Sequence, residues 1–341
     1  MDIPHNRPTF NHKETLAAQR VINSGWVAQG KRVEEFEAKF CDYVGLPHGH
    51  SVAVSSGSSA LYIAILALEA KGRRIGLPVY TCAAVNNAVK LARSKSIFID
   101  NSATGPNLDM GIANRTELHT LIAVSTFGIP LSIPVNRDYR VLEDISQALG
   151  ANVGDQKLGV AGDIGICSFS ATKLITTGGQ GGMIFSSNKS LVEFARDYRD
   201  FDAREDRLPR FNFQMTDIQG AIGTAQLKKL PNFLQKREEI FEIYTDSGLN
   251  LEREAEDNLS AVRYRAVIRH KDPLKIKARL STEGIKSIIP FTYHELLSTS
   301  SNEKNAVNYS NTTLSIPIYP TLSLKQARKI AKIVNKVMRM C

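Results

Sequence analysis

Short apolar runs alternate with helix-like periods through the first two hundred residues of this chain. Between residues 33 and 44 the apolar positions recur at spacings of three and four, which predicts an amphipathic helix: Val33, Phe36, Phe40 and Val44. Beyond it the pattern predicts strands at 52–54, 75–79, 97–100, 121–124, 141–142 and 164–169, with helices at 60–70 and 81–92. This alternation predicts an α/β fold, with a mostly parallel central sheet and helices on both faces.

The C-terminal part of the chain has a different order of elements. Residues 217–244 have a helical pattern with a break near Pro231, and the polar, acidic stretch 246–257 is typical of a linker. Beyond it the pattern predicts strands at 262–268, 285–289 and 314–318, a helix at 273–283 and a closing helix from Leu324. We therefore expect an N-terminal arm with one short helix at 1–30, a large domain at 31–245 and a small α+β domain at 246–341.

Composition and charge narrow the kinds of partner. The chain of 341 residues has 43 Lys and Arg against 34 Asp and Glu, a net charge of +9. Because the basic residues are scattered along the sequence, we interpret them as solvated surface residues and not as a nucleic-acid-binding surface. The four cysteines lie far apart and form no metal-ligand pair: Cys41, Cys82, Cys167 and Cys341. The sequence has no secretory leader and no bilayer-long apolar run, so we expect a reduced, cytoplasmic setting without metal, membrane or nucleic acid.

A turn of small residues follows the first predicted strand. The stretch SSGSS, residues 55–59, stands between that strand and a strongly apolar helix. A strand, a turn and a helix in this order direct free backbone N–H groups and the helix dipole toward an anion. The serines could instead serve only as helix N-caps, and both roles can hold together.

One lysine lies where two predicted strands meet a loop rich in glycine and hydroxyl groups. In ICSFSATKLITTGGQGGMIF, residues 166–185, Lys173 follows the run at 164–169 and precedes the apolar run at 183–185. A lysine amine can form a Schiff base with an aldehyde cofactor. The alternative is an ordinary β-hairpin with a flexible tip and a solvated lysine.

An acidic residue at another strand end adds to this candidate site. In EDISQALGA, residues 143–151, Asp144 could pair with a buried cation or a protonated ring nitrogen, or it could cap a helix. Gln147 could face the same cavity or lie on the surface. Because ligands on open α/β sheets bind at the carboxyl ends of the strands, we expect the turn, Asp144 and Lys173 at one edge of the sheet.

Several motifs in order resemble one known family, the DegT-type aminotransferases of fold type I. They are GWVAQGKRVEEFEAKFCDYVG, VAVSSGSSALYIAILAL, LEDISQALGA, FSATKLITTGGQGGMIF, FNFQMTDIQGAIGTAQLKKL and, more weakly, LSIPIYPTLS. The resemblance covers most of the chain. It implies an enzyme that uses pyridoxal 5′-phosphate (PLP) to transfer an amino group, with glutamate as donor by family analogy, to a nucleotide-linked keto-sugar.

The resemblance also implies roles for individual residues. Lys173 matches the lysine that holds PLP as an internal aldimine, and Asp144 matches the acid that keeps the pyridine nitrogen protonated. Gln147 matches a polar contact near the ring oxygen of the cofactor. The phosphate contacts are matched by Gly57, Ser58, Ser59 and Ser168. Asn212, in FNFQM, matches an asparagine that reaches the phosphate from the neighbouring subunit, which implies a homodimer with shared sites.

Two positions depart from the family pattern, and the role of a third has two interpretations. Cys82 stands where an aromatic ring often covers the face of the cofactor, with Tyr80 close by, and Gln214 replaces a common basic residue. His294 could approach the substrate, although a surface histidine is the simpler interpretation.

Two other functions compete with the enzyme hypothesis. Because of the departures at Cys82 and Gln214, a PLP-binding regulator or degenerate paralogue without turnover is the alternative. A nucleotide- or NAD-binding protein is disfavoured, because GGQGG lacks the lysine and Ser/Thr of a phosphate-binding loop and precedes a strand.

Overall fold

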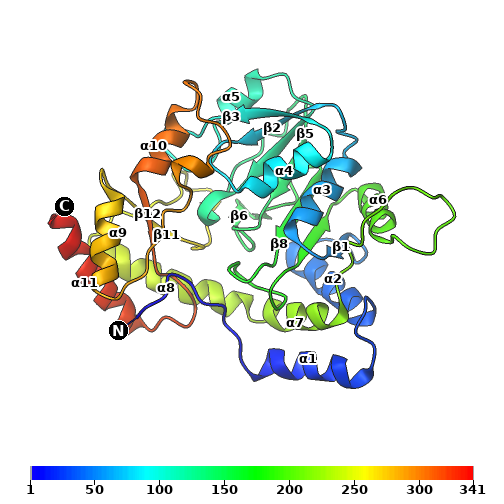
Figure 1. Ribbon diagram of the computed structural model, residues 1–341, viewed down its shortest axis with the longest axis horizontal. Helices are drawn as coiled ribbons and strands as arrows, with labels where there is room; N and C mark the ends of the chain where they lie inside the picture. The colour runs from blue at the N-terminus through cyan, green and yellow to red at the C-terminus, as the bar shows by residue number, and fades with distance from the viewer. Residues whose placement is uncertain (1, 341) are drawn as a thin grey trace.

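The computed structural model describes residues 2–340, which fold around a central sheet (Figure 1). Its seven strands are β1 (Ser51–Val54), β2 (Arg74–Pro78), β3 (Lys95–Ile99), β4 (Thr120–Val124), β5 (Arg140–Asp144), β8 (Ile164–Ser168) and β9 (Gly182–Phe185). Their order across the sheet is β1-β9-β8-β5-β4-β2-β3. Strand β9 runs antiparallel to both neighbours, and every other pair is parallel. The predicted mostly parallel sheet is therefore confirmed.

Helices cover both faces of this sheet, as predicted. One face carries α3 (Gly57–Ala67), α4 (Ala83–Leu91) and α6 (Lys189–Arg199), and the other carries α2 (Lys31–Val44), α7 (Asp217–Leu227) and the first half of α8 (Leu230–Asp246). Strand β1 shows the reason: Val52 and Val54 pack under α3, whereas Ala53 between them packs on the α2 side. Successive side chains of a strand point to opposite faces, so an all-apolar strand needs cover on both.

Shorter elements and one further helix surround the sheet. Helix α1 (His12–Ser24) lies beside α7 in Figure 1, and α5 (Met110–Arg115) packs near the outer strands. Strands β6 (Asn152–Val153), β7 (Gln156–Lys157) and β10 (Leu259–Ser260) form a small separate sheet, and η1 (Thr126–Gly128) and η2 (Tyr293–Glu295) are single 3-10 turns.

The C-terminal part builds its own core around a two-stranded antiparallel sheet. This sheet pairs β11 (Ala266–Arg269) with β12 (Thr313–Ile316), and α9 (Pro273–Thr282), α10 (Lys304–Thr312) and α11 (Leu324–Arg339) accompany it. The core cluster also includes Ile240 and Phe241 of α8, whereas Leu230 and Phe233 of the same helix belong to the large part. Helix α8 thus links the two cores, and the boundary at residue 246 stays a prediction.

The run expected as a strand at 285–289 forms only isolated bridges, one of Ile285 with the N-terminal arm and one of Ile288 with Ser315 of β12. Ile3 makes a single parallel bridge with Ile285, with hydrogen bonds of 2.8 Å from its N–H to the Gly284 carbonyl and 2.9 Å to its carbonyl from the Lys286 N–H. Ile3 is 1% exposed and lies inside the C-terminal core. The arm is therefore an integral part of that core.

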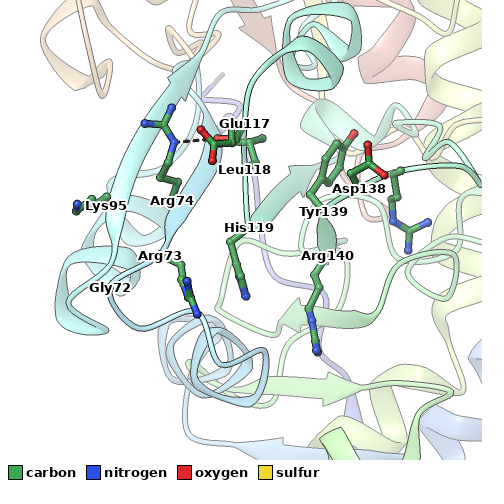
Figure 2. Close-up of a pocket in the computed structure, with 11 residues that line it drawn as sticks. Gly72, Arg73, Arg74, Lys95, Glu117, Leu118, His119, Asp138, Tyr139 and Arg140 are labelled. Carbon is green, nitrogen blue, oxygen red and sulfur yellow. Dashed lines mark hydrogen bonds between the residues drawn. The ribbon is translucent and has the colours of Figure 1, made fainter.

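The amino ends of the sheet strands border a cavity of about 700 Å³ (Figure 2). In Figure 2 the side chains of Arg73, His119 and Arg140 extend in the same direction, while Arg74 donates from Nε to the Glu117 carbonyl at 2.9 Å. Burial and the charges of Arg73 and Arg140 lower the pKa of His119. This end of the sheet is thus basic and open to solvent.

Residues 2–340 contain neither a candidate membrane-spanning helix nor a candidate metal site. None of the helices described there is both long and apolar enough to cross a membrane. In the same residues, no group of three or more His, Cys, Asp or Glu side chains is placed to bind a metal ion.

Candidate active site

Lys173 lies in the loop that joins β8 to β9. The two strands form an antiparallel hairpin that closes at the pair Ser168 and Gly182, so the predicted hairpin exists. The tip is ordered by its own hydrogen bonds, including 3.0 Å from the Lys173 N–H to the Ser170 carbonyl. Lys173 is half-buried, and its Nζ lies 5.6 Å from the ring centroid of Tyr264. The lysine is therefore held against the protein.

Asp144 ends β5 and is 7% exposed. Its Oδ1 accepts a hydrogen bond of 2.9 Å from the Ser146 N–H. Burial raises the pKa of Asp144, while this hydrogen bond and the positive charge of Lys173 act against the increase. Beside it on β8, burial and the charge of Asp144 raise the pKa of the Cys167 thiol. A buried carboxyl whose ionisation is disfavoured is a receptive partner for a cationic N–H group.

Gln147 is also buried near this strand end, at 8% exposure. Its Oε1 accepts a hydrogen bond of 2.9 Å from the N–H of Phe127. Phe127 has a φ of 61°, a left-handed conformation that is costly for an aromatic residue. One end of the Gln147 amide thus stabilises a strained turn, and its Nε2 makes no hydrogen bond to another of the residues 2–340.

The SSGSS turn caps α3, which is one of its two expected roles, and its geometry is compatible with the other. Ser56 is the N-cap of α3, and its Oγ accepts from the Ser59 N–H at 3.0 Å. The Ser59 hydroxyl contacts those of Ser55 and Ser56 at 3.1 and 2.9 Å, so it is used inside the turn. Ser58 is exposed. The N–H groups of Gly57 and Ser58, in the first two positions of the helix, have no intrahelical acceptor and can bind an anion.

Gly57 brings this turn against Ser168 at the end of β8. A Cβ atom at position 57 would lie 2.7 Å from Ser168 Cβ and 2.9 Å from its Oγ. The turn also lies on Gly182, where a Cβ would come within 2.3 Å of the Ser56 carbonyl oxygen. The structure therefore brings together the predicted phosphate contacts from two distant parts of the chain.

Other predicted positions lie at the margin of this group. Cys82 is exposed at the N-cap of α4, and Tyr80 is buried with its hydroxyl 2.9 Å from Thr313 Oγ1, so Tyr80 does not replace Cys82 as an exposed ring. His294 is exposed in η2, as the simpler interpretation expected.

Asn212 is exposed at the end of a loop that projects beyond α6 (Figure 1). Its Oδ1 accepts from the Gln214 N–H at 3.0 Å, and the Gln214 residue forms an antiparallel bridge with Val54 of β1. A shared site between subunits therefore stays a prediction, with Asn212 available for it.

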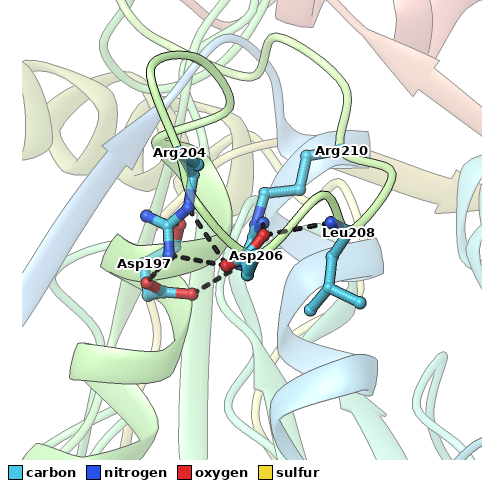
Figure 3. A network of polar contacts seen from close by, with 5 residues as sticks. All are labelled: Asp197, Arg204, Asp206, Leu208 and Arg210. Carbon is cyan, nitrogen blue, oxygen red and sulfur yellow. Dashed lines mark hydrogen bonds and ion pairs between the residues drawn. The ribbon is translucent and has the colours of Figure 1, made fainter.

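An ion-pair network closes the projecting loop on itself (Figure 3). Asp206 binds Arg210 at 2.7 Å and Arg204 at 3.1 Å, and Asp197 of α6 binds Arg210 at 3.0 Å and also pairs with Arg204. Isolated surface pairs contribute little, but four pairs among four residues restrain one another. The loop that presents Asn212 is thus fixed at its base.

Two contacts near Lys173 were missed by sequence reasoning. One is Tyr264, and the other is the N-terminal arm, where Asn6 Nδ2 donates to the Thr172 carbonyl at 2.9 Å. The neighbouring His5 contacts Ser315 Oγ at 2.9 Å, and burial, aided by the charges of Arg265 and Arg237, lowers its pKa to about 3. No motif in the sequence identifies these residues. The nearest signal is the stretch IPHN, residues 3–6, in which an apolar residue and a histidine occur in an otherwise polar arm.

Comparison with known proteins agrees with this geometry. The family model described as the DegT/DnrJ/EryC1/StrS aminotransferase family matches residues 8–335. A UDP-4-amino-4,6-dideoxy-N-acetyl-beta-L-altrosamine transaminase of Campylobacter jejuni is 28% identical over 96% of this chain and 95% of its own. A GDP-perosamine synthase of Escherichia coli O157:H7 is 28% identical over 75% and 74%. The crystal structure of an aminotransferase, TlmJ, from Streptoalloteichus hindustanus covers 100% of both chains with a TM-score of 0.92 and 24% identity.

Proposed function

This chain belongs to the DegT/DnrJ/EryC1/StrS aminotransferase family, and from that premise we propose that it binds PLP through Lys173 and aminates a nucleotide-linked keto-sugar. The aminotransferase class itself follows from the family and from its sugar transaminase relatives. The observation that carries the proposal is the convergence of Lys173, Asp144 and the amide turn at Gly57 on one edge of the sheet.

The residues present fit the cofactor. PLP carries a phosphate, a pyridine nitrogen and an aldehyde, which need an anion site, a carboxylate and an amine. The free amides of Gly57 and Ser58 with the Ser168 hydroxyl supply the first, Asp144 the second and Lys173 the third. A Cβ at position 57 would lie 2.7 Å from Ser168 Cβ, so only glycine lets the turn lie so close to Ser168.

Each residue has a defined task in the reaction. When bound, PLP supplies an electron sink for the carbanion that transamination creates. Asp144 holds a proton at the ring nitrogen, and its burial strengthens that interaction by excluding water. With the cofactor bound, the free amine of Lys173 would take the proton from the donor α-carbon as a general base and would deliver it, as a general acid, to the cofactor's aldehyde carbon. Gln147 Nε2 would contact the ring oxygen.

The relatives and the fold support the substrate class and the assembly that we propose. The two relatives are named for a UDP-linked and a GDP-linked amino sugar, so a nucleotide-linked keto-sugar is the proposed acceptor. Glutamate is the proposed donor. We also propose a homodimer in which Asn212 reaches the phosphate of the neighbouring subunit, because the residue is exposed at the end of a braced loop.

The visible spectrum of the purified protein with added PLP tests this proposal. Binding through Lys173 should produce the absorption band of lysine-bound cofactor, glutamate should remove the band, and Lys173→Ala should never show it. A band that persists with glutamate and with other amino-acid donors would favour a PLP-binding protein without turnover. If wild-type protein shows no band, the role of Lys173 is wrong.

A further inference from the structure

Four arginines lie close to one another in the C-terminal part, and three of them have clear partners. Arg237 donates to three backbone carbonyls, Arg263 is paired with Glu238 and Glu254, and Arg269 lies 3.8 Å from Glu252. Arg265 is half-buried, yet it makes no side-chain hydrogen bond or ion pair with any of the residues 2–340. Its Nε is buried without a partner. Buried guanidinium donors are rarely left unused.

Arg265 and Lys173 both lie over the ring of Tyr264. Its guanidinium carbon lies 5.2 Å from the ring centroid of Tyr264, and Lys173 Nζ lies 5.6 Å from the same centroid. The two cationic groups are therefore at most about 11 Å apart. Stacking on Tyr264 stabilises the guanidinium but uses none of its N–H donors. Those donors remain free to bind a ligand close to Lys173.

Positive charge accumulates around Tyr264. Burial alone would raise the pKa of the Tyr264 hydroxyl, but Lys173, Arg265 and Arg237 together lower it. The same Arg265 charge acts on His5 and on Tyr80. Such a concentration of cations beside a reacting amine suits an anionic group of a substrate.

We propose that Arg265 binds a carboxylate of the amino donor and so positions the donor amine at Lys173. The planar guanidinium fork matches a carboxylate in bidentate fashion, and the donor must bring its amine to Lys173 Nζ. The cofactor phosphate has its own proposed site at Gly57 and Ser168. This inference rests on the proposed function, because it assumes that Lys173 is the reacting amine.

Ligand titrations of Arg265→Met test the proposal, with Arg265→Lys as a milder second variant. With PLP bound, the glutamate concentration that half-bleaches the band should rise about tenfold or more in Arg265→Met. Methylamine, which has an amine but no carboxylate, should react with equal affinity in wild type and variant. Arg269→Met, four residues further along the chain at the end of β11 and already paired with Glu252, is the matched control and should leave the glutamate response unchanged.

A second measurement does not depend on the reaction. Glutarate, a dicarboxylate without an amine, should bind the cofactor-free wild-type protein in calorimetric titration, with affinity reduced about tenfold or more in Arg265→Met. If glutamate bleaches wild type and Arg265→Met alike and glutarate binds both equally, the Arg265 inference fails while the proposed function stands. A weaker apparent affinity for the sugar nucleotide with unchanged glutamate would assign Arg265 to the acceptor phosphate and overturn the inference. Absence of any band in wild type contradicts the proposed function, and the glutarate result then decides the arginine site by itself.

Discussion

The two ends of the central sheet differ in how deeply their charged side chains are buried. At the amino ends, the cavity of about 700 Å³ is lined by basic side chains such as Arg73, Lys95 and Arg140, which are exposed to solvent. At the carboxyl ends, Asp144 is buried and Lys173 half-buried, and the amide turn at Gly57 lies against Ser168.

The comparison shows that cavity size and charge count do not locate the reaction. Exposed arginines keep their hydration, so their accumulation at a sheet end costs little and does not by itself indicate a reaction site. A buried carboxyl and a guanidinium with a buried, unpartnered Nε each cost free energy unless a ligand completes them. Asp144 lies at the carboxyl end of β5 and Arg265 contacts the same ring as Lys173, which agrees with where ligands bind on open α/β sheets.

Replacing one lysine at each end gives the largest expected contrast. Lys173→Ala should lower the turnover rate by about 10⁴-fold or more, because it removes both the covalent anchor and the proton carrier. Lys95→Ala, at the amino ends, should leave kcat within twofold of wild type. Steady-state kinetics with glutamate and a keto-sugar nucleotide measure both. An equal loss in the two variants would mean that the ends are not distinct.

Replacing one acidic residue at each end of the sheet gives a second contrast. The variant at the carboxyl ends should lose activity but gain stability, whereas the variant at the amino ends should change neither. Asp144→Asn should slow the glutamate half-reaction by about 10²–10³-fold. Burial raises the Asp144 pKa above its unfolded value, so ionisation at neutral pH destabilises the folded state, and the variant should unfold at a higher temperature without cofactor. Asp138→Asn, which is exposed, should change neither property. Stopped-flow absorbance and thermal unfolding give the two readouts, and a less stable Asp144→Asn would contradict the assigned burial cost.

Variants of His5 and His119 should differ in how strongly the free energy of unfolding depends on pH. The pKa of His5 is lowered to about 3, so its neutral form stabilises the fold above pH 6.5, and this stabilisation is lost as the pH falls from 6.5 toward 3. The loss approaches about 1.4 kcal/mol per pH unit. Urea unfolding at pH 7 and pH 5 should show a smaller pH effect in His5→Gln than in wild type. His119→Gln should change it less, since solvent reaches His119, and the reverse order would refute the comparison.

Two glycines separate loss of a ligand site from backbone strain. In Gly57→Ala the new Cβ would meet Ser168 at 2.7 Å, and overpacking of about 1–3 kcal/mol should weaken PLP binding about tenfold. Gly72, beside the amino-end cavity, has a φ of 75° and nothing within 4 Å of an added Cβ. Gly72→Ala should cost about 1–2 kcal/mol of stability without changing PLP affinity. PLP titrations with unfolding curves test the pair, and normal PLP affinity in Gly57→Ala would argue against the phosphate site.

Local patterns in the sequence were enough to predict the strands and the active-site edge. The alternation of elements predicted the sheet, and the strand-end positions of Asp144 and Lys173 predicted that they would lie at one edge of it. The structure places both there, and the positive charge of Lys173 counteracts the rise in the Asp144 pKa. Helix α3 begins at Gly57, three residues before the predicted start, because Ser56 caps it. The apolar run 285–289 predicts a strand, whereas the structure shows only two isolated bridges there, Ile285 with Ile3 and Ile288 with Ser315.

The sequence alone therefore determined the family, the main order of elements and the candidate reacting residues, since periodicity, capping and motif spacing act over a few neighbouring positions. Only the tertiary structure decided that Arg265 stacks on Tyr264 next to Lys173, that the arm crosses to Thr172, and that Tyr80 turns inward to Thr313. Such contacts join segments far apart in the chain, and they depend on how two separately packed cores meet along α8. No local preference encodes that meeting.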